Sequence, residues 1–225
     1  MPPAVAGEEV RRLEQALDVI RTGRVVAVLR GEDGTRLAAA AEVLVESGVR
    51  AVEFSLTTPG ALEALGRYSL GAPARACVGA GTVLSAAQAR EAVARGARYL
   101  VTPALAPEVV AAGAEMDVPV VCGALSPTEI LSAYTAGAAI VKVFPASLGG
   151  PGYLRLLRDP LPRIPLLPTG GIGIEQVPDY LAAGAVAVGM GGALLGDAAL
   201  GGDLAELGRR ARRLVSLLGE AGAAA

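Results

Sequence analysis

The chain has 225 residues, of which 52% are hydrophobic, 19% charged and only 3% aromatic, and its formal net charge is −2. This length suits one large domain with a core of small aliphatic side chains. The balanced charge offers no electrostatic footprint for nucleic acid or for an anionic membrane. The first residues lack the apolar stretch of a secretory signal, and the longest uncharged run, residues 180–196, is too short to span a bilayer. We therefore expect a cytoplasmic protein that acts on a small molecule.

Two features of the composition narrow the chemistry. The chain has no histidine, which excludes Ser–His and Cys–His nucleophile pairs and almost every catalytic zinc site. It has a single lysine, Lys142, among 20 basic residues. A chain that takes its surface charge from arginine has no need of lysine for that purpose. Cys77 and Cys122 lie in apolar surroundings and are expected to be buried free thiols, with a disulfide between them as the alternative. Neither a metal nor an organic cofactor is expected.

The hydrophobic pattern alternates between short runs of Val, Ile and Ala and longer segments of helical period. A helix over residues 8–21 is expected first, with helices such as 35–47 and 85–95 in the gaps and a final one over residues 203–218. The expected strands are 25–29, 51–54, 77–79, 99–101, 119–122, 140–143, 166–168 and 185–188. These eight βα units predict one α/β domain over residues 1–225, a (β/α)8 TIM barrel with an extra N-terminal helix. An open doubly wound sheet is the alternative, although no Gly-x-Gly-x-x-Gly turn follows the first strand.

Lys142 lies in one of these expected strands. Side chains alternate along a strand, so Lys142 shares a face with Ile140 and Phe144, while Val141 and Val143 face the helices. The amine is therefore expected among the inward layers of the barrel. Burial of an unpaired ammonium is costly, and a neutral amine relieves that cost and is the species that attacks a ketone carbonyl. A structural salt bridge inside the barrel is the alternative, but this chain would be expected to use arginine for it.

Glu53 interrupts the second apolar strand near its C-terminal end and shares a face with Ala51. A carboxyl group there, near Lys142, is suited to move protons to and from a substrate, with its pKa raised by the apolar setting. A buried ion pair that only holds the core together is the alternative. Arg30 ends the first strand and suits a carboxylate or phosphate, or else a surface salt bridge.

Three glycine-containing turns are further candidates for binding. In Gly79-Ala-Gly-Thr82 the Thr82 hydroxyl is available to a carboxylate oxygen, although a tight turn without a ligand explains this motif equally well. Two more turns follow the seventh and eighth strands, where many barrels bind phosphate through backbone N–H groups. Their residues are Thr169, Gly170, Gly171, Gly191 and Gly192. Two glycine turns without a ligand are the alternative.

In their order along the chain, these motifs resemble those of the KDPG/KHG aldolases, that is, 2-keto-3-deoxy-6-phosphogluconate and 4-hydroxy-2-oxoglutarate aldolases with the 6-phosphogalactonate branch. The similar segments are Val-Glu53-Phe-Ser-Leu, Val78–Leu84, Thr102-Pro103, Val-Lys142-Val-Phe-Pro-Ala, Pro168–Ile172 and Gly191-Gly192. The resemblance implies a metal-independent class I aldolase of Entner–Doudoroff carbohydrate metabolism, assembled as a homotrimer. The expected products are pyruvate with glyceraldehyde 3-phosphate, or pyruvate with glyoxylate from 4-hydroxy-2-oxoglutarate.

The resemblance also implies a role for each matched residue. Lys142 is expected to form the Schiff base, and Glu53 to be the general acid and base. Thr82 is expected to hold the pyruvyl carboxylate, and Pro103 to line the site. The residues expected to bind the phosphate are Thr169, Gly170, Gly171, Gly191 and Gly192.

Three departures from the gluconate enzymes leave the substrate open. Thr57 stands where Arg is usual, Cys122-Gly123 replaces Pro-Gly, and Gly192 replaces a Ser. The segments Leu29-Arg-Gly31 and Gly150–Tyr153 are instead similar to the 6-phosphogalactonate branch. A phosphosugar isomerase or epimerase on the same barrel is a rival, but such epimerases need histidine around a metal. A non-catalytic phosphate-binding barrel is another rival, and it leaves Lys142 and Glu53 without a purpose.

Overall fold

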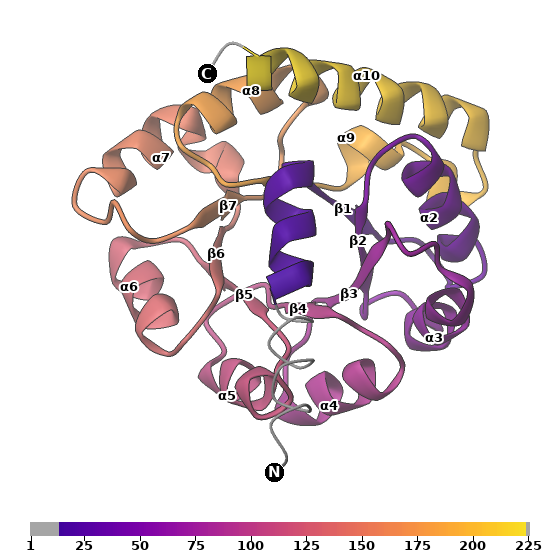
Figure 1. Cartoon of the computed structure of the whole chain (residues 1–225), viewed down its shortest axis with the longest axis horizontal. Coiled ribbons are helices and arrows are strands. Elements are labelled where there is room, and N and C mark those ends of the chain that lie inside the picture. Colours follow the sequence, from indigo (N-terminus) through magenta and orange to yellow (C-terminus); the bar gives the residue numbers. More distant parts are fainter. Residues whose placement is uncertain (1–13, 224–225) are drawn as a thin grey trace.

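The computed structural model describes residues 14–223, and eight parallel strands form a barrel at its centre (Figure 1). They are β1 (Val25–Leu29), β2 (Ala51–Ser55), β3 (Cys77–Gly81), β4 (Tyr99–Val101), β5 (Val120–Ala124), β6 (Ile140–Val143), β7 (Leu166–Pro168) and β8 (Val188–Met190). Their order in the sheet is β7-β6-β5-β4-β3-β2-β1-β8. An isolated bridge between Thr169 and Gly189 brings β7 next to β8. The expected (β/α)8 barrel is confirmed.

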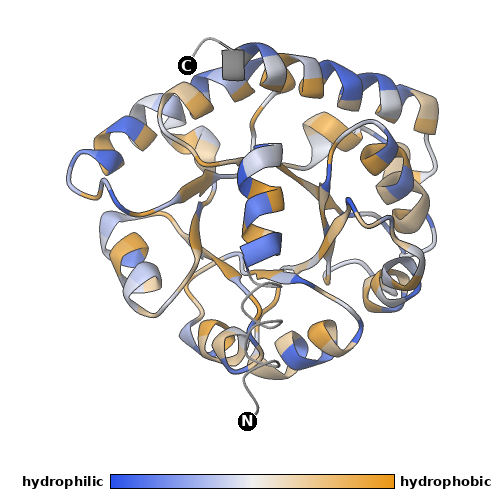
Figure 2. Ribbon diagram, in the orientation of Figure 1, coloured by the Kyte–Doolittle hydropathy of each residue, from blue (hydrophilic) through white to orange (hydrophobic). Residues whose placement is uncertain are grey.

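The helices surround the strands and turn their hydrophobic faces toward them (Figure 2). They are α2 (Leu37–Glu46), α3 (Ala61–Gly71), α4 (Ala86–Ala94), α5 (Pro107–Glu115), α6 (Pro127–Thr135), α7 (Gly150–Arg158), α8 (Val177–Ala182), α9 (Gly192–Leu195) and α10 (Leu204–Ala223). Three short 3-10 helices are η1 (Ala146–Leu148), η2 (Ile174–Gln176) and η3 (Ala198–Leu200). Within residues 14–223, no helix combines the length and the apolar character needed to cross a membrane.

Some expected boundaries differ from the structure. The last strand spans Val188–Met190, not residues 185–188. The amide of Ala185 still bonds to Tyr180 and belongs to the end of α8. β2, β3 and β5 continue one or two residues beyond their expected ends. Residues 14–23 form a helix before β1, and the rest of the helix expected over residues 8–21 lies outside the described residues.

Two hydrophobic clusters divide the core. The larger cluster fills the space between the strands and the surrounding helices and includes Val141 and Val143. The smaller one fills the inside of the barrel, with Tyr99 and Ile140 among its members. The N-terminal helix joins this inner cluster through Ala16, Leu17 and Ile20 and lies across the middle of the barrel in Figure 1. The inner cluster therefore fills one end of the barrel, and the carboxyl ends of the strands are left to build a site.

Candidate active site

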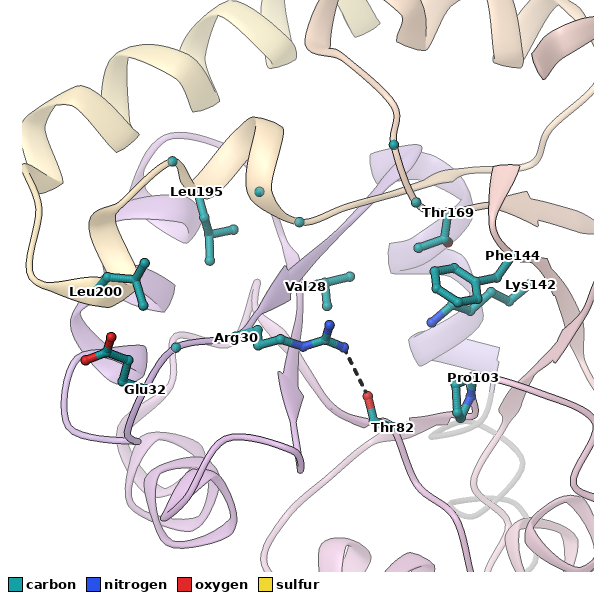
Figure 3. Close-up of a pocket in the computed structure, with 16 residues that line it drawn as sticks. Val28, Arg30, Glu32, Thr82, Pro103, Lys142, Phe144, Thr169, Leu195 and Leu200 are labelled. Carbon is teal, nitrogen blue, oxygen red and sulfur yellow. Dashed lines mark hydrogen bonds between the residues drawn. The ribbon is translucent and has the colours of Figure 1, made fainter. Parts of the chain in front are cut away.

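A cavity of about 520 Å³ lies at the carboxyl ends of the strands (Figure 3). The sequence-predicted site residues that line it are Arg30, Thr82, Pro103, Lys142, Thr169, Gly170, Gly171, Gly191 and Gly192. Glu53, the remaining candidate, is not part of the lining and is almost fully buried. Residues far apart in the sequence thus come together because each follows or ends a parallel strand.

Lys142 projects from β6 into this cavity, and only 6% of it is exposed. Its neighbours Val141 and Val143 face the helices and Ile140 faces the inner cluster, as the alternation of the strand predicts. The ammonium nitrogen lies 5.2 Å from the centre of the Phe144 ring. Figure 3 shows the amine pointing into the cavity, with Pro103 nearby. The expected inward placement of Lys142 is confirmed.

Glu53 is 2% exposed and lies on the inward face of β2. Its carboxyl group occupies the space above Gly81, where any side chain would collide with it. Burial raises the pKa of Glu53, although the positive charges of Lys142 and, less strongly, Arg30 lower it. Among the described residues, neither Lys142 nor Glu53 makes a salt bridge within 4.0 Å. The two groups influence each other electrostatically without forming the structural ion pair that was the alternative for each.

A cluster of three hydroxyl groups borders the cavity between β2 and β3. The Ser55 hydroxyl hydrogen bonds to that of Thr57 at 2.9 Å and to that of Thr82 at 3.0 Å. Arg30 reaches the same cluster from the end of β1 and donates contacts of 3.4 Å to Ser55 and to Thr82. Figure 3 shows the contact with Thr82. Thr82 has a φ of 57°, a conformation that β-branched residues rarely adopt. Thr57, which stands where the resemblance has Arg, therefore belongs to a network that holds a guanidinium supplied by Arg30.

The glycine turns after β7 and β8 form the opposite wall. Gly170 and Gly171 have φ values of 95° and 71°, which only glycine adopts readily. Together with Gly191 and Gly192 they also line a second, adjoining cavity of about 290 Å³. α9 begins at Gly192, and the first amides of a helix have no intrahelical partner. Backbone amides at the end of two strands are therefore available to an anion.

Several residues at or near the cavity were not predicted from the sequence. Phe144 lines the cavity, and its place on the Lys142 face of the strand was the signal that could have identified it. Ser55 does not line the cavity but hydrogen bonds to Thr82, which does, and it could have been found from its two-residue spacing to Glu53. Leu195 and Leu200 line the far end beside Glu32. Nothing in the local sequence pattern marks them, because they end the short helices α9 and η3 beyond β8.

The site therefore combines a buried primary amine, a carboxyl group with a raised pKa, a guanidinium and glycine-rich backbone. A primary amine can condense with a ketone, and a carboxyl group with a raised pKa can accept a proton and return it. Cations and backbone amides suit an anionic substrate. Within the part of the chain that the structure describes, no group of three or more His, Cys, Asp or Glu side chains is placed to hold a metal ion.

Comparison with known proteins gives a consistent family. The family model for KDPG and KHG aldolase matches residues 17–209. A 2-dehydro-3-deoxy-phosphogluconate aldolase of Treponema pallidum is 38% identical over 169 residues, which are 75% of this chain and 79% of that protein. A probable 2-dehydro-3-deoxy-6-phosphogalactonate aldolase of Rhizobium meliloti is 33% identical over 181 residues, 80% of this chain and 85% of that one.

A solved structure is similar over nearly the whole barrel. It is a KDPG aldolase from Legionella pneumophila with pyruvate captured at low pH as a covalent carbinolamine intermediate. The similarity has a TM-score of 0.75 and 27% sequence identity, and it covers 90% of this chain and 96% of the other.

Proposed function

The chain belongs to the KDPG and KHG aldolase family, and from that premise we propose that it is a class I aldolase whose Schiff base forms on Lys142. It cleaves 2-keto-3-deoxy-6-phospho sugar acids of the gluconate or galactonate series to pyruvate and glyceraldehyde 3-phosphate. One observation carries the assignment of the nucleophile. The only lysine of the chain presents a buried amine to the cavity at the carboxyl ends of the strands.

The reaction begins with attack of the neutral Lys142 amine on the C2 carbonyl of the keto acid. The resulting carbinolamine takes up a proton from solvent at its hydroxyl group, which leaves as water, and an iminium ion remains. Glu53, as carboxylate, then accepts the proton of the C4 hydroxyl. The C3–C4 bond breaks, its electron pair moves into the iminium to give an enamine, and the C4 fragment leaves as an aldehyde. The iminium serves as the electron sink for this step.

The enamine is then converted to the second product. Protonation at C3 by Glu53, now a carboxylic acid, restores the iminium. Water then hydrolyses the iminium to pyruvate and the free Lys142 amine, and the proton taken up during dehydration returns to solvent. A carboxyl group whose pKa is raised by burial suits both halves, because it holds a proton more readily than an exposed carboxylate does and can release it again. The same steps convert 4-hydroxy-2-oxoglutarate to pyruvate and glyoxylate, which we propose as a further substrate.

Substrate binding is divided between two walls of the cavity in this proposal. Arg30 and Thr82 hold the carboxylate of the keto acid, and Pro103 limits the space beside the amine. The phosphate lies against the turns after β7 and β8. These turns contribute Thr169, Gly170, Gly171, Gly191 and Gly192. The positive φ values of Gly170 and Gly171 support this part of the proposal, because they bring bare backbone to the cavity.

Borohydride reduction in the presence of pyruvate tests the nucleophile. We expect one reduced pyruvyl group per chain by intact mass, and peptide mapping should place it on Lys142. The matched variant Lys142→Arg keeps a cation but no primary amine at that position, so it should acquire no such group. Modification of the N-terminal amine alone, or equal modification of the variant, would contradict the assignment.

We further propose that the chain assembles as a homotrimer and acts in the cytoplasm. Large exposed hydrophobic side chains on and near the neighbouring helices α6 and α7 support association. They are Leu131, Tyr134, Leu148 and Leu156. Light scattering should give three times the 22.5 kDa chain mass, and a monomer at the assay concentration would contradict it. The free buried thiols of Cys77 and Cys122 suit a reducing compartment, which cell fractionation tests.

A further inference from the structure

Two polar side-chain atoms inside the barrel have no hydrogen-bond partner among the described residues. They are Oε1 of Glu53 and the hydroxyl oxygen of Tyr99. Tyr99 is completely buried and belongs to the inner cluster, below the cavity. Burial of an unpaired hydroxyl group costs free energy, and a phenylalanine would fill the same ring volume without that cost. The ring of Tyr99 therefore accounts for its packing, and the hydroxyl group needs another explanation.

The strand register brings these two residues into one row. Glu53 on β2 is paired with Gly79 on β3, and Gly79 is paired with Tyr99 on β4. A side chain on Gly79 would collide with the Cζ and Cε atoms of the Tyr99 ring, which are the ring atoms nearest the hydroxyl. The hydroxyl end of Tyr99 thus extends across Gly79 toward β2. Two residues further along the same strand, Gly81 makes room for the Glu53 carboxyl group in the same way.

The charges around Glu53 come from several elements. Lys142 on β6 and Arg30 at the end of β1 favour its charged form. Burial raises the pKa of Tyr99 well above its ordinary value, and the nearby Cys77 and Glu53 raise it further. The Tyr99 hydroxyl therefore stays protonated throughout the neutral range. It is a hydrogen-bond donor on the side of Glu53 away from the cavity.

We propose that Tyr99 is a positioning residue for Glu53, whose hydroxyl supports the carboxylate from beneath through one internal water. Buried polar groups that lack a protein partner are commonly satisfied by such waters. The proposal rests on the proposed function of Glu53 as proton acceptor. Tyr99 does not touch the substrate. It stabilises the charged form of Glu53, which accepts the C4 hydroxyl proton.

The variant Tyr99→Phe tests this role through the pH dependence of kcat for cleavage. Loss of the donor disfavours the carboxylate, so Glu53 needs a higher pH to lose its proton. We expect the acid limb of the profile to move upward by roughly one pH unit, which is roughly tenfold lower activity on that limb. Above the limb the activity should approach that of the wild type. Phenylalanine keeps the ring packing, so the melting temperature should not fall.

Tyr68→Phe is a matched control. The Tyr68 hydroxyl is also buried and has no partner within residues 14–223, but it lies on α3, in the outer cluster beside Phe54. Tyr68→Phe should leave the pH profile unchanged, because the loss of a hydroxyl group with only a structural role does not affect the titration of Glu53. The inference is overturned if the profile of Tyr99→Phe superimposes on those of the wild type and of Tyr68→Phe while pyruvate is still trapped on Lys142. Failure of the wild type to trap pyruvate would contradict the proposed function instead.

Discussion

The Lys142 amine lies 5.2 Å from the centre of the Phe144 ring. The two residues are two positions apart, so the alternation of β6 continues into the following turn and directs both side chains to the cavity. The same ring packs against the turn after β7, because any side chain on Gly170 would collide with it. Phe144 therefore lies between the amine and the glycine turn that we assign to phosphate binding.

Replacement of Phe144 by leucine should slow the reaction although it keeps an apolar side chain. The iminium on Lys142 is a cation, and the face of an aromatic ring stabilises a nearby cation by about 0.5–2 kcal/mol. This corresponds to a roughly 2- to 30-fold lower kcat. Single-turnover kinetics should place the loss after carbinolamine formation, and Phe144→Tyr, which keeps the ring, should be much less affected. Equal kcat for Phe144→Leu and the wild type would show that the ring only fills space.

The variant Glu53→Gln should separate Schiff-base formation from turnover. Glutamine has a similar shape but accepts no proton, so turnover should fall by about 10²–10⁴-fold, the range of general acid–base groups. Trapping of pyruvate on Lys142 by borohydride should persist in part. Turnover near the wild-type rate would assign Glu53 a structural role.

The same variant should also change how stability depends on pH. Burial raises the pKa of Glu53 above 4.5 in the folded chain, so the folded protein binds this proton more readily than the unfolded chain does. The tighter binding of the proton stabilises the folded state at low pH. This stabilisation is lost as pH rises from about 4.5 through the raised pKa, because the charged carboxylate is less favourable in the folded protein than in the unfolded chain. Glu53→Gln should melt higher than the wild type above that window and not below it. Parallel melting curves across the whole range would contradict the raised pKa.

Chelators should leave activity unchanged. In the proposed mechanism the iminium on Lys142 accepts the electrons of the broken bond, so no step needs a metal ion as electrophile. The chain also lacks histidine, the commonest ligand of transition metals in proteins. Activity should be measured after dialysis against EDTA and again after Mg²⁺ or Zn²⁺ is added back. Loss of activity in EDTA that the metal restores would overturn the metal-independent mechanism.

Much of this site can be predicted from the alternation of side chains along the strands and from the positions of the strand ends in the sequence. The alternation of β6 predicts the inward placement of Lys142, and strand ends predict where Arg30 and the glycine turns gather. Contacts between side chains of different strands do not follow in this way. The hydroxyl cluster around Ser55 depends on the φ of Thr82, and the space above Gly79 depends on the strand register. The local sequence pattern predicts neither the hydroxyl cluster nor the space above Gly79, because both depend on how strands distant in the sequence pair.

Arg30→Ala should weaken every keto acid substrate, phosphorylated or not. Arg30 is held by Ser55 and Thr82 at the edge of the cavity, where we propose that it binds the shared carboxylate. A charge-assisted contact of this kind contributes about 1.5–3 kcal/mol, or on the order of ten- to a hundredfold in kcat/KM. Arg90→Ala is a control, since Arg90 lies away from the cavity in an exposed ion pair with Glu115. A neutral effect of Arg30→Ala would leave carboxylate binding to Thr82 and backbone amides.

The last prediction concerns the phosphate and uses Gly192 in preference to Gly171. A side chain on Gly171 would be strained at a φ of 71° and would collide with Ser147, so a loss of activity there would not distinguish binding from folding. A Cβ on Gly192 meets no atom within 4 Å. The variant Gly192→Val should therefore fold normally while its side chain occupies space at the start of α9, where we place the phosphate.

Two substrates make the test of Gly192→Val specific. Cleavage of a 6-phospho keto-deoxy acid should lose on the order of ten- to a hundredfold in kcat/KM, because hydrogen bonds to a charged group are displaced. Cleavage of 4-hydroxy-2-oxoglutarate, which has no phosphate, should stay close to the wild-type rate, and inhibition by inorganic phosphate should weaken. Gly152→Val is the matched control, since a Cβ at this exposed helix position also has free space. An equal loss on both substrates would show that the turn serves the fold and that the phosphate binds elsewhere.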